Sequence, residues 1–217
     1  MTDHQVSELS DWGLLLVEGS DAGSFLQGQL TNSILGMTRT PPAAIARSYS
    51  GVRLSGYCTA KGRLLGSAWI CLSTDAEQDR FAPFVSRDLA ATFAKRLAMF
   101  VLRSKAKVVD VSHAWTVYGV LGPANTLPAN LPSDAIALAM TQPSGTGDQE
   151  RILFATQTPL PSQSTSSQYL AAWNAAEIAS AIPRIVLATQ DQFVPQMINL
   201  ESIGGVDFKK GCYPGQE

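Results

Sequence analysis

The chain has 217 residues, of which 45% are hydrophobic and only 16% charged, and its formal net charge is −2 at pH 7. This composition excludes a disordered chain and predicts a globular protein of one or two domains. Acidic and basic residues nearly balance, which leaves no electrostatic basis for expecting nucleic acid or an anionic membrane as a partner.

The first half of the chain predicts strands and helices in short groups. A buried strand is expected at residues 13–18, and a helix capped by Ser20 or Asp21 is expected to run through residue 32. The following segment favours β structure: alternation over residues 45–49, a turn at 50–51, extended chain at 54–58, a hairpin tip at 61–63, and strands at 64–72 and 80–85.

The second half begins with the clearest helical pattern, expected to run from a cap at Ser86 through residue 103. Four strands and one more helix follow, with strands at 107–111, 115–121, 135–140 and 151–156 and the helix at 169–181. The strands do not alternate strictly with helices. The pattern therefore predicts an α+β fold with mixed or antiparallel sheets and a few helices, rather than a doubly wound sheet.

The cysteines and the N-terminus bear on the compartment. Cys58, Cys71 and Cys212 are an odd number of widely spaced cysteines, which is typical of free thiols in a reducing compartment. With two histidines and no Cys-x-x-Cys pair, we expect no metal site held by this chain alone. Residues 1–12 contain no Lys or Arg and no apolar run of the signal-peptide type. We expect a cytoplasmic protein.

Cys212 has neighbours that favour a reactive thiol. It follows Lys209, Lys210 and Gly211, and a nearby ammonium stabilises a thiolate. Gly211 and Gly215 permit unusual backbone angles and leave space for a ligand or partner. These features fit a nucleophile, a metal ligand or a redox sensor. The alternative is a packing cysteine in an ordinary turn.

The sequence around this thiol resembles the signature of the YgfZ family, which are folate-binding relatives of the aminomethyltransferase (T-protein) of the glycine cleavage system. The run Lys-Gly-Cys-Tyr-Pro-Gly-Gln-Glu occupies residues 210–217, and residues 195–208 are also similar. The same family is resembled by Phe-Leu-Gln-Gly-Gln-Leu-Thr at residues 25–31 and by the segment with the Lys-Gly-Arg turn at residues 57–64. The resemblance is strong at both ends of the chain and weak between residues 105 and 180.

The resemblance implies a two-part α+β body and a C-terminal β-barrel around an opening that binds tetrahydrofolate. On this basis we expect residues 1–42 and 112–217 to form a first, discontinuous domain and residues 43–111 an inserted second domain. The barrel is absent from this chain, which we expect to be a fragment or the product of a truncated gene. Part of the wall of the folate-binding opening would then be missing.

The resemblance also implies a function, namely support for the assembly or repair of iron–sulfur proteins, including tRNA-modifying radical enzymes. Cys212 is the expected working thiol and Lys210 its electrostatic activator. Folate and, transiently, iron–sulfur proteins or their assembly machinery are the expected partners, with no membrane and no direct contact with nucleic acid. The chain is therefore expected to be an accessory protein rather than a standalone catalyst.

Candidate folate contacts come from both ends of the chain: Lys61, Arg63, Asn199, Glu201, Gly211, Tyr213, Gly215 and Gln216. Arg pairs bidentately with carboxylates such as those of the folate tail, and a carboxylate matches the amino-pyrimidine edge of a pterin. The alternatives are a solvated hairpin tip for Lys61 and Arg63 and capping or loop roles for Asn199 and Glu201. Trp12, Trp69, Trp115 and Trp173 are either pterin-stacking or core residues.

The alternative function is a tetrahydrofolate-dependent aminomethyl or methyl transferase. Such an enzyme needs a group that handles a proton during transfer, and T-proteins place an Asp near the pterin on the turn that here contains Lys61 and Arg63. No carboxylate lies between Arg53 and Asp75. Its absence argues against aminomethyl transfer.

Overall fold

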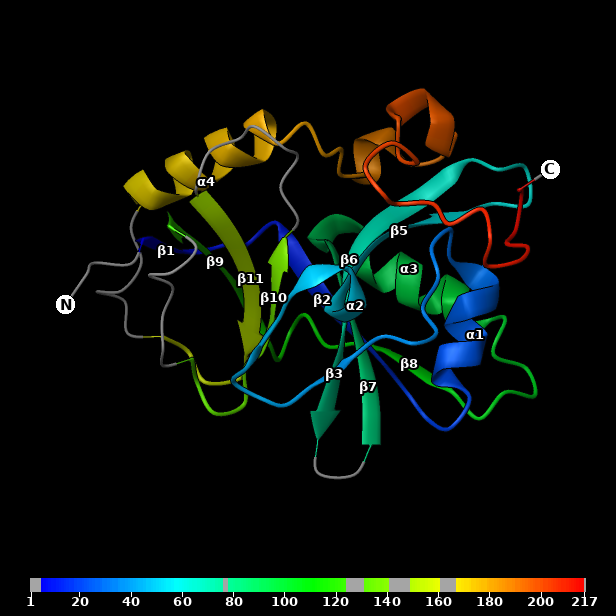
Figure 1. The fold of residues 1–217 in the computed structure, drawn as a ribbon, viewed down its shortest axis with the longest axis horizontal. Helices are drawn as coiled ribbons and strands as arrows, with labels where there is room; N and C mark the ends of the chain where they lie inside the picture. Colours follow the sequence, from blue (N-terminus) through cyan, green and yellow to red (C-terminus); the bar gives the residue numbers. More distant parts are fainter. Residues whose placement is uncertain (1–4, 76–77, 124–130, 141–148, 161–166, 217) are drawn as a thin grey trace.

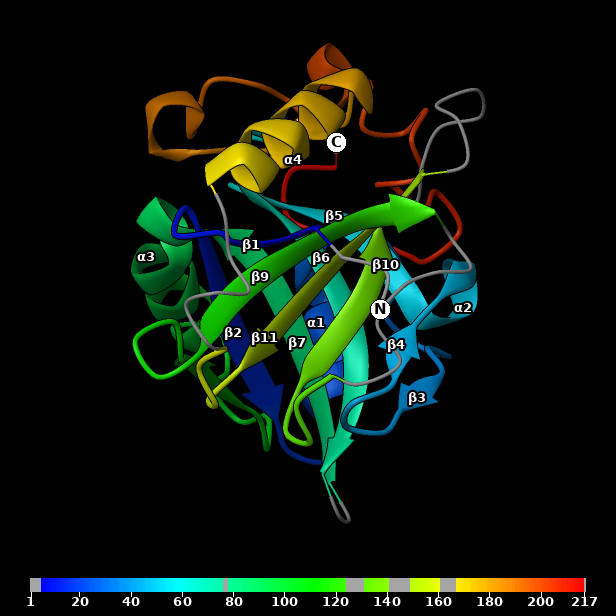
Figure 2. The same ribbon diagram turned by 90° about the vertical axis from the view of Figure 1, so that its left-hand side faces the viewer.

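The computed structural model describes residues 5–75, 78–123, 131–140, 149–160 and 167–216. Two β-sheets face each other, two helices cover the outer face of one sheet, and a third helix lies across one end of the other (Figures 1 and 2). The C-terminal segment lies on the side of the molecule opposite strand β1 (Gln5–Glu8), beside the hairpin of the second sheet (Figure 1). The predicted α+β class with mixed sheets is confirmed.

The first sheet has five strands, and every pairing in it is antiparallel except that between its last two strands. In spatial order these are β1 (Gln5–Glu8), β9 (Thr116–Pro123), β11 (Gln149–Thr156), β10 (Ile136–Met140) and β4 (Ile45–Ala46). Its long strands carry apolar residues on successive positions because both faces are covered.

The second sheet has six strands, and its longest strand is paired on both sides. In spatial order these are β3 (Arg39–Thr40), β6 (Leu64–Asp75), β7 (Gln78–Ser86), β2 (Trp12–Glu18) and β8 (Lys107–Asp110), with β5 (Val52–Cys58) paired to β6. The β5–β6 hairpin carries the turn at residues 59–63, and the bulge at its end falls between Tyr57 and Cys58.

The helices are α1 (Ala22–Gln29), α2 (Ser48–Gly51), α3 (Arg87–Ala98) and α4 (Ser167–Ala179), with short 3-10 turns at Leu187–Thr189 and Pro195–Ile198. Apolar faces of α1 and α3 pack on the second sheet, for example through Leu26, Phe93 and Leu97. Helix α4 contacts β1 and β9. No helix in the described part of the chain is long and apolar enough to cross a membrane.

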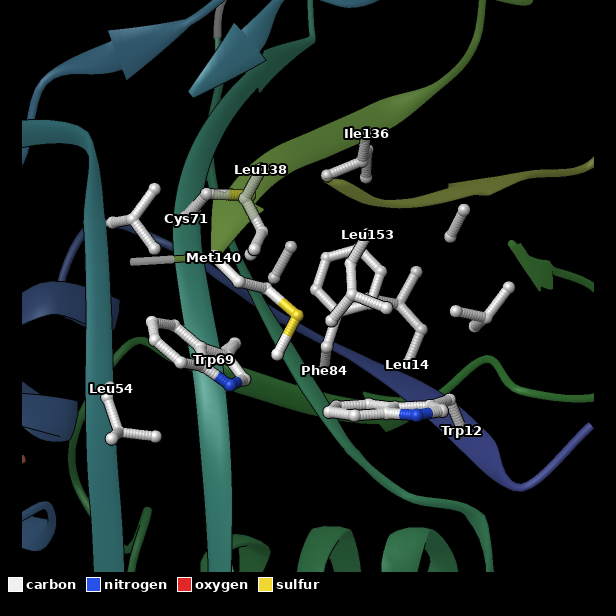
Figure 3. Close-up of a cluster of buried hydrophobic side chains, with 14 of the residues drawn as sticks. Trp12, Leu14, Leu54, Trp69, Cys71, Phe84, Ile136, Leu138, Met140 and Leu153 are labelled. Carbon is white, nitrogen blue, oxygen red and sulfur yellow. The ribbon is translucent and has the colours of Figure 1, made fainter. Parts of the chain in front are cut away.

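The main core lies between the sheets (Figure 3). The second sheet contributes Trp12, Trp69 and Phe84, which meet Leu138 and Leu153 of the first sheet. Complete burial of such a side chain contributes about 1.5–3 kcal/mol to folding. The core therefore joins segments from the two ends of the chain.

Several local predictions were wrong. The helix expected to run through residue 103 ends at Ala98, and the one expected to run through residue 32 ends at Gln29. Residues 47–49 were expected to extend a strand, but β4 ends at Ala46 and a helical turn begins at Ser48. Ser48 has a φ of 60°, which is incompatible with extended chain. Strand β1 was missed because its polar sequence, Gln-Val-Ser-Glu, has little hydrophobic signal and becomes a strand by pairing with β9.

The division at residues 42 and 112 stays a prediction. Strand β2, from the expected first domain, pairs with β7 and β8, which lie in the expected insertion. The two sheets also share one hydrophobic core. The boundary of any inserted domain therefore crosses a continuous sheet.

Candidate functional site

The segment after α4 folds back over the β5–β6 hairpin without adding a strand to either sheet (Figure 1). Main-chain bonds attach it to the start of β6, with Leu64 N donating to Phe193 O at 2.7 Å and Asp191 N donating to Leu64 O at 2.8 Å. Leu200, Val206 and Tyr213 enter the main core. The segment is thus held by both apolar burial and backbone bonds.

Buried polar side chains after α1 hold the middle of this segment. The Thr31 hydroxyl donates to the carbonyl of Gly205 at 2.6 Å and accepts from Gly56 N at 2.7 Å. The Asn32 amide donates to the carbonyl of Gly204 at 2.7 Å. These bonds join the end of the motif at residues 25–31 to Gly204 and Gly205, which precede the motif at residues 210–217.

The hairpin turn and the C-terminal turn interlock through two glycines. Gly62 and Gly215 have φ values of 74° and 75°, which favour glycine. A Cβ on Gly215 would lie 2.1 Å from Gly62 N, and one on Gly62 would lie 2.6 Å from Gly215 O. Neither position can carry a side chain without separating the turns. The segment at residues 57–64 and the motif at residues 210–217, which both resemble the family, are therefore in direct contact.

We name residues 208–216 the thiol loop. Cys212 lies in this loop and is exposed. Cys58 and Cys71 are buried, and burial raises the pKa of each thiol to about 12. Both remain protonated at neutral pH. Cys212 is therefore the accessible thiol of this chain, and it lines an open pocket of about 440 Å³ with Ala60, Tyr213, Pro214, Gly215 and Gln216.

The side chain of Lys210 leaves the thiol loop toward helix α1 rather than extending into solvent. Its Nζ donates to the main-chain carbonyl of Gln27 at 2.6 Å, and the ammonium lies 5.4 Å from the centre of the Tyr213 ring. Burial lowers the pKa of Lys210, and the nearby charges of Asp207 and Cys212 oppose that shift. Lys210 is therefore fixed at the base of the loop, two residues before Cys212.

The structure separates the other predicted folate contacts. Lys61 is exposed, whereas Nη1 of Arg63 donates to the carbonyls of Asp191 and Gln192 at 3.3 and 3.1 Å. Arg63 therefore fastens the C-terminal segment to the hairpin. Asn199 is exposed in a left-handed conformation at the end of a 3-10 turn.

The remaining predicted contacts differ in exposure. Oε2 of Glu201 is buried without a hydrogen-bond partner among the described residues. Gly211 is exposed with a φ of 95°, and Tyr213 is buried in the core. The side chain of Gln216 accepts a bond from Tyr213 N at 3.2 Å. No cluster of potential metal ligands occurs among the described residues.

A second polar site, which sequence reasoning missed, lies between the sheets beneath α4. Arg151 of β11 is fully buried, and none of its three guanidinium nitrogens has a hydrogen-bond partner in the described part of the chain. Its guanidinium carbon lies 5.8 Å from the Trp173 ring. A small cavity lies beside Arg151, and we name it the Arg151 chamber. Its lining includes Trp12, Ser67, Trp69, Arg151, Glu177 and Arg184.

Glu177 and Arg184 form the outer wall of the Arg151 chamber. Arg184 Nε lies 3.2 Å from Glu177 Oε1, and its guanidinium lies 4.4 Å from the Trp12 ring and also pairs with Asp11. Burial raises the pKa of Glu177, although Arg184 and Arg151 oppose the shift. Burial lowers the pKa of Arg151, and Glu177 opposes that shift. The wall therefore keeps a carboxylate between two cations.

The chamber itself has room for about one water, with a volume of about 10 Å³. On the other side of the wall is an open outer pocket of about 690 Å³, also lined by Glu177, Ile182, Pro183 and Arg184. Pockets of this size accept drug-sized ligands. The sequence carried no local signal for this site, because Arg151 follows Gln149 and Glu150 at the polar start of its strand.

Comparison with known structures defines the class of fold. The chain superposes on the crystal structure of the glycine cleavage system aminomethyltransferase T from Bartonella henselae with a TM-score of 0.51 and 16% identity. The match covers 81% of this chain and 45% of that protein. The chain therefore has an aminomethyltransferase T fold.

Comparison with curated sequences identifies particular relatives. The tRNA-modifying protein YgfZ of Edwardsiella ictaluri is 31% identical over 230 residues, which cover 96% of this chain and 64% of that protein. The protein of the same name from Aliivibrio fischeri is 29% identical, covering 98% and 64% respectively. No protein-family profile matches the chain. The resemblance to YgfZ is confirmed, and the chain spans 64% of the length of these homologues.

Proposed function

We propose that this protein binds tetrahydrofolate and supports the assembly or repair of iron–sulfur proteins, including tRNA-modifying radical enzymes. The homologues named tRNA-modifying protein YgfZ support a link to tRNA modification. The aminomethyltransferase T fold supports a folate ligand. The observation that carries the folate proposal is the buried guanidinium of Arg151, which has no hydrogen-bond partner in the described part of the chain.

The groups around the Arg151 chamber fit the chemistry of folate. Burying an arginine without partners is costly, so its donors call for a ligand with acceptor oxygens. Folate has such oxygens on its pterin ring and in its carboxylates. Glu177 offers a carboxylate to an amino-pyrimidine edge. Tetrahydrofolate would supply a carrier for one-carbon units.

The sizes of the two spaces indicate how a ligand would sit. The chamber has room for about one water, whereas the outer pocket is about 690 Å³. The body of the folate would occupy the outer pocket, with one end directed at Arg151. This position requires the Glu177–Arg184 wall to open.

The role of Cys212 is proposed from its accessibility and its neighbours. It is exposed in the thiol loop, two residues after Lys210, whose ammonium is fixed on the main chain of Gln27. Lys210 would stabilise the thiolate, and the positive φ of Gly211 would shape the backbone beside it. The thiol would act on a client protein, while folate binds separately in the outer pocket with one end directed at Arg151.

The geometry disfavours the alternative, aminomethyl transfer to folate. The central group of the Arg151 chamber is a guanidinium, which stays protonated and cannot accept a proton at neutral pH. The chamber's carboxylate, Glu177, is paired with Arg184. Purified protein is expected not to form methylenetetrahydrofolate from an aminomethyl donor.

Calorimetric titration of tetrahydrofolate tests the ligand and its site. We expect saturable binding by the wild type and by Cys212→Ala, and at least tenfold weaker binding by Arg151→Met, because charged hydrogen bonds contribute about 1.5–3 kcal/mol. Arg39→Met, which removes an arginine from a surface ion pair with Asp79, is the matched control. Absence of binding by folded wild type would refute the folate proposal.

The client role needs a separate test in cells. Cys212→Ala should abolish support of a radical tRNA-modifying enzyme while leaving the thermal melt unchanged, since the side chain is exposed. Cys71→Ala, which removes a buried thiol, controls for loss of any cysteine. Full enzyme activity in cells carrying Cys212→Ala would remove the thiol from the mechanism.

A further inference from the structure

The end of α1 and the thiol loop are joined by a reciprocal pair of hydrogen bonds. Gln27 Nε2 donates to the carbonyl of Lys210 at 3.2 Å, and Lys210 Nζ donates to the carbonyl of Gln27 at 2.6 Å. Each residue thus binds the other through its side chain and its main chain. These bonds link the motif at residues 25–31 directly to Lys210, two positions before Cys212.

The Gln27 amide has a fixed orientation. Its Oε1 accepts from the main-chain N–H of Ile34 at 2.7 Å, from that of Leu35 at 3.3 Å and from the Ser33 hydroxyl at 3.4 Å. Only the amide oxygen can accept these bonds, so the NH2 group must face the thiol loop. The chain beyond α1 therefore determines where Gln27 presents its donor.

The position of the Lys210 ammonium follows from this arrangement. The carbonyl it binds lies in the last turn of α1, where the helix dipole favours a cation. The charged and aromatic groups facing the ammonium are Asp207, Cys212 and the Tyr213 ring. Lys210 makes no hydrogen bond to Cys212 within the described residues, so its effect on the thiol acts through space.

We propose that Gln27 is a positioning residue of the thiol site, which acts through Lys210 by holding its ammonium where it stabilises the Cys212 thiolate. The inference rests on the proposed role of Cys212 as the working thiol. It adds a residue from the other end of the chain to that site.

The test is the rate of Cys212 alkylation by iodoacetamide as a function of pH, followed by mass spectrometry on the folded protein. We expect Gln27→Ala to slow the reaction about threefold at neutral pH and to move the profile to higher pH, as expected for a displaced charge near the protein surface. Lys210→Met should have the same effect. Gln29→Ala, on the same helix but without a hydrogen bond to the thiol loop in the described structure, should leave the profile unchanged.

The double variant separates positioning from simple loosening of the loop. If Gln27 acts through Lys210, adding Gln27→Ala to Lys210→Met changes nothing further. An additional shift in that background, or no shift by Gln27→Ala alone, would overturn the proposal. Because alkylation needs neither folate nor a client, this result stands apart from the calorimetric and cellular tests of the proposed function.

Discussion

The thiol loop and the Arg151 chamber use buried polar groups in opposite ways. Polar groups that hold the loop and the chain leading into it are satisfied within the protein, as in the pairs Gln27–Lys210 in the loop and Thr31–Gly205 just before it. In the chamber, Arg151 is buried without hydrogen-bond partners among the described residues. The loop is therefore organised before any partner arrives, whereas the chamber has unsatisfied donors that a ligand can complete.

The largest effect is expected from breaking the loop's contact with the hairpin. Gly215→Ala should lower the free energy of unfolding by roughly 2–4 kcal/mol, because it combines backbone strain with a clash against Gly62 N. Urea unfolding measures the change. Gly211→Ala is the matched control, since Gly211 also has a positive φ but a Cβ there would meet nothing within 4 Å, and it should cost about 1 kcal/mol. Equal losses in both variants would mean that the interlock contributes nothing.

The chamber should respond in the opposite direction. Arg151→Met should raise the free energy of unfolding by about 1–3 kcal/mol, because it removes a buried charge without hydrogen bonds from the core. Calorimetric melting of the ligand-free protein tests this expectation. A destabilised variant would show that Arg151 stabilises the fold, and the contrast between the two regions would then fail.

A smaller loss is expected where the chain just before the thiol loop meets the residues that follow α1. Thr31→Val keeps the shape of the side chain but removes the bonds to Gly205 O and Gly56 N, and should cost about 1–2 kcal/mol. Denaturant unfolding gives the value. Thr92→Val, which removes a hydroxyl from the surface of α3, provides the comparison. The interpretation of a preorganised loop is wrong if the two variants lose the same stability.

The smallest effect concerns pH and the wall of the chamber. The pKa of Glu177 is raised in the folded state, chiefly by burial, so folding favours its protonated form. Its contribution to stability is fully present below the usual pKa of 4.5 and is lost as the pH rises through the folded-state pKa. Relative to Glu177→Gln, the wild type should lose stability as the pH increases over this window. Parallel pH profiles for the two proteins would contradict the prediction.

Individual elements show how far sequence reasoning reached. The periodic pattern of α3 and the apolar run of β2 predicted these elements because each has a hydrophobic face wide enough to be recognised locally. The polar strand β1 and the short turn at Ser48 had no such pattern, since pairing with β9 and a positive φ determine them. The C-terminal motif directed attention to Cys212, and the structure shows that thiol exposed.

Arg151 shows what could not be predicted locally. As one charged residue in a strand, it is indistinguishable from a residue on a solvated face, and its neighbours Trp12, Glu177 and Arg184 lie far from it in sequence. Burial and missing partners are properties of the assembled sheets. The electrostatic character of the chamber therefore appears only in three dimensions.

Residue patterns were sufficient to predict the α+β class and the likeness to YgfZ, because periodicity and contiguous motifs are local properties. The roles of Cys212 and Lys210 stay predictions. Three other features emerge only from the folded chain: Gly62 meets Gly215, Gln27 holds Lys210, and Arg151 is buried without hydrogen-bond partners in the described residues. The first two are contacts between segments separated by long stretches of chain, and the third depends on what surrounds Arg151 in the assembled sheets. Their positions depend on how the two sheets pack, and no local pattern encodes that packing.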